Sequence, residues 1–406
     1  MKDIFSEHAP RQDDRTKAKP FFLINLVMQF MGDSKQFSLE SIRRSINSTS
    51  GTPISRSTFW ERLTTKVLGK RLSSILNDTT KLLSSSCGID PKLMQSLGVT
   101  GLSYFDSTII TLRDNASQFF DGTFTLSAIK FHLESDGISG ALKWAILSAA
   151  SVHDNCAFPS IDSLVGRLSV FDLGYFDWPR FKEMNELGAF FLSRLKSNAT
   201  VYIHEIVCGL GKKHQGKKLG SLSFKRSRGN IIKFNTFRKI DGHKVRFRVI
   251  GFWNPILKKY HWYVTNLECE AIFIAPLYRL RWQLELLIKS AKQSLNLNQI
   301  TTENENIIIN LCTAKLIALT ISMIIRKIGL LNMQDERRYS ISLQRSAMVL
   351  TNLAKDFVNY IIDALDGCRA LLRGRINAML GELYDPNYKR RRSSMQAVVD
   401  MAYGVK

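Results

Sequence analysis

The sequence has no cysteine pattern on which a zinc ribbon or a disulfide framework could be built. Its six cysteines are far apart, and no two of them form a Cys-x-x-Cys pair: Cys87, Cys156, Cys208, Cys269, Cys312 and Cys368. This spacing excludes both kinds of stabilised small domain. Free thiols in a reducing cytosol fit the pattern best.

Segments for export or for crossing a membrane are also missing. No apolar stretch of the signal-peptide kind occurs in the opening segment MKDIFSEHAPRQDDR, so we expect no export. The most apolar segment, 307–331, carries Asn310 and three charged residues, Lys315, Arg326 and Lys327. Its uncharged run, 316–325, is too short to cross a bilayer. We therefore predict a buried core helix and no membrane partner.

Acidic residues are scarce relative to basic ones. The 406-residue chain has 35 Asp and Glu against 57 Lys and Arg, which gives a formal charge of +22 and a pI near 9.8. Such an excess predicts a polyanionic partner, with nucleic acid first and an anionic membrane surface second. The hydrophobic content of 45% excludes wholesale disorder, and the length allows two or three cores.

The N-terminal part, 1–98, has the pattern of helices with short breaks. Thr58 and Glu61 have the spacing of a capping box ahead of a periodic segment. Two short helices joined by NSTSGTPIS fit a helix-turn-helix variant as well as a plain helical bundle. In the first case four arginines would face phosphates: Arg43, Arg44, Arg56 and Arg62.

From 99 to 198 the pattern changes to short apolar strands around one helix. The predicted strands are GLSYFDSTII, TLSAIKFHLES, ALKWAILSAAS, RLSVFDLG and AFFLSRL, and the predicted helix is WPRFKEMNELG. Strand, helix, strand with a crossover is typical of an α/β fold. Such sheets place their chemistry at the carboxyl ends of strands.

Two aspartates occupy notable places in these strands. Asp106 lies within or at the end of the first strand, and Asp172 ends a later strand just before the Gly174 turn. A carboxylate in an apolar strand is costly unless it is paired or binds a metal, although a hydrogen-bonded structural Asp106 remains an alternative. Asp154 and Asp162 are rivals for the role of Asp172.

Residues 199–268 have the pattern of a basic β-rich insertion. A hairpin turn is predicted at Asp241-Gly242. Beyond it, apolar residues alternate with three cations that face the other way: Lys244, Arg246 and Arg248. Between 209 and 250 there are 13 Lys and Arg against one acid, so we predict a phosphate-binding face.

A helix over 277–294 places polar side chains on one narrow face: Tyr278, Arg281, Glu285, Lys289 and Lys292. The apolar stripe beside them would face a core: Leu277, Leu280, Leu284, Leu287, Ile288, Ala291 and Leu295. A solvated face with a salt-bridge ladder would explain the polar line equally well.

The order of carboxylates Asp106, Asp172 and Glu285 resembles the DDE transposases of bacterial insertion sequences, in particular the insertion-sequence-four family. The signature of that family is Tyr-x2-Arg-x3-Glu-x6-Lys, and four residues match it at every spacing: Tyr278, Arg281, Glu285 and Lys292. Other blocks also resemble the family, namely FDSTII, DLGY, IKFHL, SVHDN and YVTNL. The similarity runs from about residue 100 to residue 330.

The resemblance implies a ribonuclease-H-like α/β core in two parts, 99–198 and 269–345. The β-rich insertion, 199–268, would interrupt it. A helical DNA-binding region, 1–98, would precede the core, and a helical region with a basic tail, 346–406, would follow it.

The resemblance also implies a metal site. Asp106, Asp172 and Glu285 would hold two Mg²⁺ ions about 4 Å apart, with Asp106 bridging them and Mn²⁺ able to substitute. Terminal DNA would be bound by Tyr278, Arg281 and Lys292, with Trp282 stacking on a base or packing in the core. Supporting or core roles are favoured over a zinc site for His132, His153 and Asp154.

The function implied is cut-and-paste transposition by a homodimer that binds terminal inverted repeats and target DNA. A hairpin intermediate at the ends is implied by the family alone. The expected location is the bacterial cytoplasm, on the nucleoid when DNA is bound. A catalytically inactive DNA-binding derivative and a metal-dependent nuclease without strand transfer are the alternatives.

Overall fold

The computed structural model describes residues 26–27, 38–50, 53–85, 91–137, 140–224, 229–295 and 300–332, with Ser346 and Leu383. The predictions for 346–406, including the basic run from Lys389 to Arg392, otherwise lie outside the described residues.

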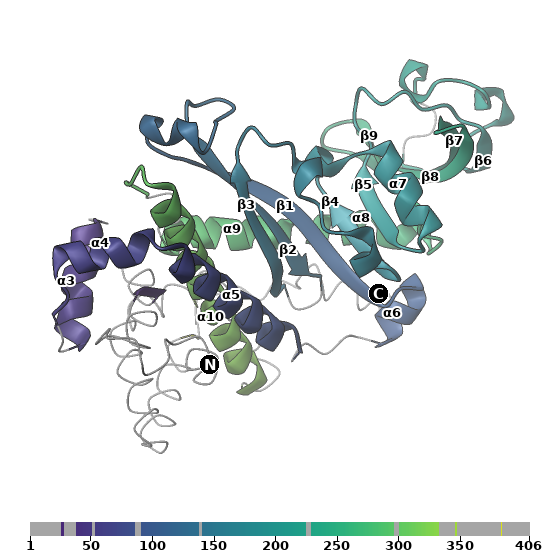
Figure 1. Ribbon diagram of the computed structural model, residues 1–406. Coiled ribbons are helices and arrows are strands. Elements are labelled where there is room, and N and C mark those ends of the chain that lie inside the picture. Colours follow the sequence, from purple (N-terminus) through teal and green to yellow (C-terminus); the bar gives the residue numbers. More distant parts are fainter. Residues whose placement is uncertain are drawn as a thin grey trace.

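In the described part of the chain, nine strands form one mixed sheet. The strands are β1 (Gly101–Thr111), β2 (Ala128–Asp136), β3 (Leu142–Ala149), β4 (Arg167–Phe171), β5 (Phe190–Arg194), β6 (Glu205–Cys208), β7 (Ile232–Ile240), β8 (His243–Asn254) and β9 (Lys259–Thr265). Their order is β3-β2-β1-β4-β5-β9-β8-β7-β6, as Figure 1 shows. The β1/β4 and β4/β5 pairs are parallel and the others antiparallel. The predicted mixed α/β class is confirmed.

The β-rich segment continues the same sheet. β9 pairs with β5 in antiparallel register, with Leu192 opposite Thr265. The predicted hairpin turn between β7 and β8 is present, because Asp241 (φ 48°) and Gly242 (φ 82°) both adopt left-handed backbone angles. The sheet ends at β6, which pairs with β7 in antiparallel register, with Glu205 opposite Asn235.

Two hydrophobic cores cover the two faces of the sheet. One core packs β1–β3 against three helices: α5 (Lys66–Ser85), α9 (Trp282–Ser294) and α10 (Glu305–Asn332). The other lies under α7 (Trp178–Glu186) and is rich in phenylalanine. Within it the rings of Phe181 and Phe191 stack with their centroids 4.2 Å apart. Side chains of β1 therefore alternate between two buried environments.

The apolar segment of α10 is a core helix, as predicted. Residues 305–328 are long and apolar enough to cross a membrane, yet 89% of that window is buried inside the protein. α10 packs along α5, and the sheet lies beside the pair (Figure 1).

The described N-terminal helices are α3 (Leu39–Ser50), α4 (Arg56–Thr64) and α6 (Pro91–Leu97), together with α5. The predicted capping box is wrong: Ser55 is the N-cap of α4, and its hydroxyl accepts from the Thr58 backbone N–H. Arg43 donates to Glu40 and to the Ile54 carbonyl, so it braces the α3–α4 connection.

Asn310 fastens α10 to the end of α4. Its buried side-chain amide donates to the carbonyl oxygen of Leu63 at 2.8 Å. A Cβ added at Gly69 would lie 2.8 Å from Asn310 Oδ1. The two positions are therefore in contact across the helix pair.

We predict that Asn310→Ala lowers the free energy of unfolding by about 1–3 kcal/mol, because a buried carbonyl loses its donor. Gly69→Ala should destabilise the wild type through its contact with Asn310. In the Asn310→Ala background it should instead stabilise by up to about 1 kcal/mol through helix propensity. Urea unfolding of the four proteins measures this, and Ser73→Ala on the exposed side of α5 is the control. Additive effects would contradict the contact.

Candidate active site

Asp106 lies inside β1, not at its end, because the strand continues to Thr111. By the two-residue period of a strand it faces the same side as Leu102 and Tyr104, which pack toward α9 and α10. Its side chain is only 12% exposed. The carboxyl group of Asp106 is therefore nearly buried among apolar side chains.

Asp172 follows β4 directly, as the sequence predicted. In the parallel β1/β4 pair, Phe105 lies opposite Phe171. The next residue of each strand is an aspartate, so the register brings Asp106 and Asp172 side by side.

Glu285 comes from the helical segment that packs across β1. The predicted single helix is divided into α8 (Ile274–Leu280) and α9, with Arg281 between them in right-handed helical conformation. The predicted apolar stripe is buried along its whole length: Leu277, Leu280, Leu284, Leu287, Ile288, Ala291 and Leu295. Burial of this stripe turns Glu285 and Arg281 toward the strand that carries Asp106.

Arg281 bridges all three carboxylates. Its Nη1 donates to Asp106 Oδ2 at 2.7 Å, and its Nη2 donates to Glu285 Oε1 at 2.5 Å. Nη2 is also 3.7 Å from Asp172 Oδ1. The three acidic side chains, distant in sequence, thus converge on one guanidinium. The solvated salt-bridge ladder that the helix alone allowed does not describe this arrangement, since Arg281 is 14% exposed.

Burial, together with the weaker effect of the neighbouring carboxylates Asp172 and Glu285, raises the pKa of Asp106 to about 6. Arg281 and the Ser107 backbone N–H, which donates to Oδ1 at 2.9 Å, act to lower that pKa. Burial also acts to lower the pKa of Arg281, but the carboxylates raise it above its ordinary value. The site is a strongly coupled group of charges.

The trio supplies hard oxygen donors of the type that Mg²⁺ prefers. Among the described residues, no three His, Cys, Asp or Glu side chains are already spaced to hold a metal ion. The guanidinium of Arg281 shows that positive charge is accepted at the point where these carboxylates meet. The chemistry of the donor set therefore fits divalent cations.

The rival aspartates lie elsewhere. Asp162 is exposed and accepts from the Ser160 hydroxyl at 3.0 Å. Asp154 lies near Lys130 and His132, with its Oδ1 3.3 Å from Lys130 Nζ. Neither is paired with Arg281 among the contacts of the described residues.

The other residues of the signature lie around the trio. Tyr278 packs edge-on against Tyr263, with ring centroids 5.3 Å apart, and burial raises its pKa to about 12. Lys292 donates to the Ile109 carbonyl at 3.2 Å, and burial lowers its pKa. Trp282 is 57% exposed, so the core role that the sequence allowed for it is excluded.

The three cations of β8 have different surroundings. Lys244 is exposed and lies over the Phe237 ring, and exposed Arg246 pairs with Glu268 at 3.4 Å. Arg248 differs from the expectation: its Nη1 donates to two backbone carbonyls, of Leu267 at 2.6 Å and Cys269 at 2.7 Å. These bonds brace the connection between β9 and α8.

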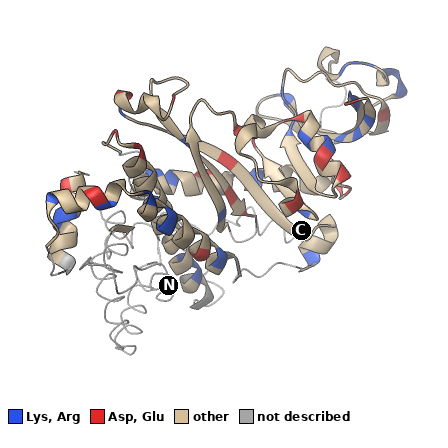
Figure 2. Cartoon of the chain, in the orientation of Figure 1, with Lys and Arg blue, Asp and Glu red and all other residues tan. Residues whose placement is uncertain are grey.

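Figure 2 shows that Lys and Arg recur along the outer strands β7 and β8 and in the loops beside them. Four exposed lysines of the segment before β7 add to this charge: Lys212, Lys213, Lys217 and Lys218. The residue count predicted this excess of basic side chains. It did not predict that the strands carrying them belong to the same sheet as β1, the strand of Asp106.

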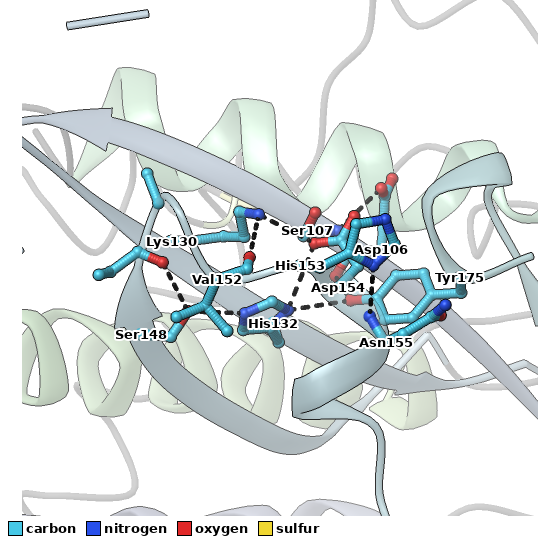
Figure 3. Close-up of polar contacts among 12 residues, drawn as sticks. Asp106, Ser107, Lys130, His132, Ser148, Val152, His153, Asp154, Asn155 and Tyr175 are labelled. Atoms are coloured by element: carbon cyan, nitrogen blue, oxygen red, sulfur yellow. Dashed lines mark hydrogen bonds and ion pairs between the residues drawn. The ribbon is translucent and has the colours of Figure 1, made fainter. Parts of the chain in front are cut away.

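The structure brings Lys130, His132, Asp154 and Tyr175 together in a cluster behind Asp106 (Figure 3). The sequence favoured supporting or core roles for His132 and Asp154, but it predicted no role for Lys130 or Tyr175. The blocks IKFHL, SVHDN and DLGY, which contain these residues, were the available signal. His153 is exposed, and its Nδ1 accepts from the Asn155 backbone N–H, so it does not join His132.

Comparison with known proteins identifies the class. Residues 100–321, more than half of the chain, match the family model of the transposase DDE domain. The chain therefore belongs to the family of transposases with a DDE domain.

One relative is the transposase for insertion sequence element IS231B of Bacillus thuringiensis subsp. berliner, which is 30% identical over 119 residues. The match covers 27% of this chain and 25% of the relative, so the chain spans about a quarter of that protein's length. A cryo-EM structure of piggyBac transposase, in a synaptic complex with hairpin DNA, aligns with a TM-score of 0.48 and 12% identity. That alignment covers 94% of this chain and 79% of the other.

We predict that Arg281→Met, in metal-free buffer, lowers the free energy of unfolding by about 2–4 kcal/mol. The change removes one partner of a buried ion pair and leaves Asp106 uncompensated. The other two carboxylate partners of Arg281, Asp172 and Glu285, are nearly half exposed, so their ion pairs should contribute little to the free energy of unfolding. Asp106→Asn in the Arg281→Met background should restore most of the lost free energy of unfolding, because it removes the uncompensated carboxylate.

Urea unfolding measures the cycle. Arg246→Gln is the control, because its ion pair with Glu268 is exposed and its loss should cost less than about 1 kcal/mol. Equal losses for Arg281→Met and Arg246→Gln would contradict the central role of Arg281.

Proposed function

We propose that this chain is a DNA transposase that mobilises an insertion sequence by a cut-and-paste reaction. It would cleave at the ends of its element and join the freed 3′ hydroxyl to target DNA. The observation that carries the proposal is the meeting of Asp106, Asp172 and Glu285 around Arg281. We assign the chain to the insertion-sequence-four group because its four-residue signature surrounds this trio.

The strand arrangement supports a ribonuclease-H-like core. Three antiparallel strands, β3, β2 and β1, are continued by the parallel strands β4 and β5. The acidic residues lie on the central strand β1, at the end of its parallel neighbour β4, and on α9, which packs across β1. β6–β9 would then be an insertion that extends the core sheet.

Asp106, Asp172 and Glu285 would hold two Mg²⁺ ions, or Mn²⁺ in their place. Such ions activate the attacking oxygen and stabilise the leaving oxygen of a phosphodiester. The burial of Asp106 keeps bulk water away from one side of the site. Arg281 adds positive charge beside the scissile phosphate, where a guanidinium binds phosphate oxygens well.

DNA would run from the acidic trio toward the outer strands. Tyr278 and Lys292 flank the trio, and exposed Trp282 is placed to stack on an extruded base. Lys244 and Arg246 would contact phosphates farther out. We place Arg248 among the residues that hold the β9–α8 connection instead.

Two further parts of the proposal follow from the family resemblance. Two protomers would pair the terminal inverted repeats as a homodimer in the DNA complex. The protein would act in the bacterial cytoplasm, on the nucleoid when bound to DNA.

The test uses the purified chain, Mg²⁺ and duplexes that carry the inverted repeats flanking its coding region. We expect cleavage and joined products from the wild type. Asp106→Asn, Asp172→Asn and Glu285→Gln should each bind the ends but cleave more than about 100-fold more slowly, beyond the usual effect of losing an outer partner of a metal ligand. Asp114→Asn, an exposed carboxylate after β1, is the control and should cleave normally.

Undiminished cleavage by Glu285→Gln would contradict the proposal. Binding without nicking by the wild type would favour an inactive DNA-binding derivative. Nicks without joined products would favour a nuclease.

For DNA affinity, we predict that the logarithm of the association constant falls steeply with the logarithm of salt concentration. Lys244→Ala and Arg246→Ala should each reduce the slope by about 1, as expected for lost phosphate contacts. Arg248→Met, from the same strand, should leave the slope unchanged and lower the unfolding midpoint. Fluorescence anisotropy between about 50 and 200 mM salt measures the slopes, and a flat response would contradict the basic face as a binding surface.

A further inference from the structure

A buried polar cluster lies on the face of β1 opposite Asp106. Figure 3 shows Lys130, His132, Ser148, Asp154 and Tyr175 pointing toward one another; these five residues are the back-face cluster. His132 pairs with the residue after Asp106 in the β1/β2 register and is fully buried. The cluster therefore lies directly behind the catalytic strand.

His132 is the centre of this cluster. Its Nε2 is 2.9 Å from Ser148 Oγ, and its Nδ1 is 3.3 Å from the Tyr175 hydroxyl and 3.6 Å from Asp154 Oδ1. Burial lowers the pKa of His132, which favours the neutral ring. The two ring nitrogens therefore face Ser148 on one side and Tyr175 and Asp154 on the other, while the Ser148 hydroxyl donates to the Ala149 carbonyl at 3.0 Å.

Tyr175 connects this cluster to both aspartates of the site. Its hydroxyl donates to the backbone carbonyl of Asp106 at 3.4 Å. Tyr175 also ends the short turn that begins at Asp172. One buried ring thus ties the strand of the first carboxylate to the turn of the second.

Asp154 packs against the same turn at Gly174. A Cβ added at Gly174 would lie 2.2 Å from Asp154 Oδ2, so the turn can approach only because residue 174 has no side chain. Asp154 is itself held by Lys130, whose Nζ is 3.3 Å from Oδ1 and donates to the Val152 carbonyl at 2.7 Å. These contacts of Lys130 hold the Asp154 carboxylate close to Gly174.

The turn needs such an anchor because Asp172 has little to hold it. Its side chain is 45% exposed, and its ion pair with Arg281 is long, at 3.7 Å. An exposed pair of that kind orients a side chain weakly.

We propose that Asp154 and His132 are positioning residues that lock the 172–176 turn against β1, so that Asp172 stays within reach of Asp106. They act through Gly174 and Tyr175 and touch no reacting atom. This inference rests on the proposed function of the acidic trio.

The test compares Asp154→Asn, Tyr175→Phe and Gly174→Ala with the wild type. Asp154→Asn keeps the shape of the side chain, and Tyr175→Phe removes only the hydroxyl, so both should fold. Amide hydrogen exchange over 172–177 should speed up on the order of tenfold in each, while β8 and β9 exchange as before. Asp162→Asn, an exposed carboxylate in the same stretch of chain, should change nothing.

Cleavage provides the second readout. The same three variants should cleave element ends about 10- to 100-fold more slowly with unchanged DNA affinity, the range for residues that orient metal ligands. In an Asp154→Gly background, Gly174→Ala should have little further effect, because the oxygen that it meets is gone.

Wild-type exchange over 172–177 in both Asp154→Asn and Tyr175→Phe would overturn the inference. The exchange readout requires no cleavage. Undiminished cleavage by Asp106→Asn would therefore overturn the proposed function alone, and loss of cleavage by Asp106→Asn with normal cleavage by Asp154→Asn would overturn the positioning role alone.

Discussion

The burial of a carboxyl group in the middle of β1 is the constraint on which the rest of the site depends. Asp106 lies between apolar neighbours, and an unpaired charge there would be expelled or neutralised. The fold compensates with Arg281, which the break between α8 and α9 points at the strand. Asp172 and Glu285 also contact the Arg281 guanidinium, so the charges of the three carboxylates are coupled through it.

The sheet places these groups without long loops. Parallel pairing of β1 and β4 makes Asp106 and Asp172 neighbours, and α9 is held across β1 by its buried leucines. The second core, under α7, supports the other side of the same strands, where His132 and Tyr175 lie. The geometry of the acidic trio therefore depends on packing on both faces of the sheet.

The elements themselves could be predicted from sequence, because apolar alternation and the Asp241-Gly242 turn are local signals. The acidic trio was predicted by resemblance; the structure brings its three carboxylates to Arg281, and their catalytic and metal-binding roles stay predictions. Contacts between distant segments were not predictable. Nothing local to Arg281 shows that it meets Asp106, and nothing local to Arg248 shows that it binds the carbonyls of Leu267 and Cys269.

The side chain of Arg248 has a mechanical consequence. It joins β8, within the basic part of the sheet, to the short stretch that leads from β9 toward α8, and α9 with Glu285 follows. A duplex bound to the outer strands, as proposed, would therefore be connected through Arg248 to the segment that carries Glu285. Extra residues could be accommodated at the β7–β8 tip, far from any chemistry. The same residues placed after Thr265 would separate the proposed DNA-binding strands from the helices that lead to Glu285.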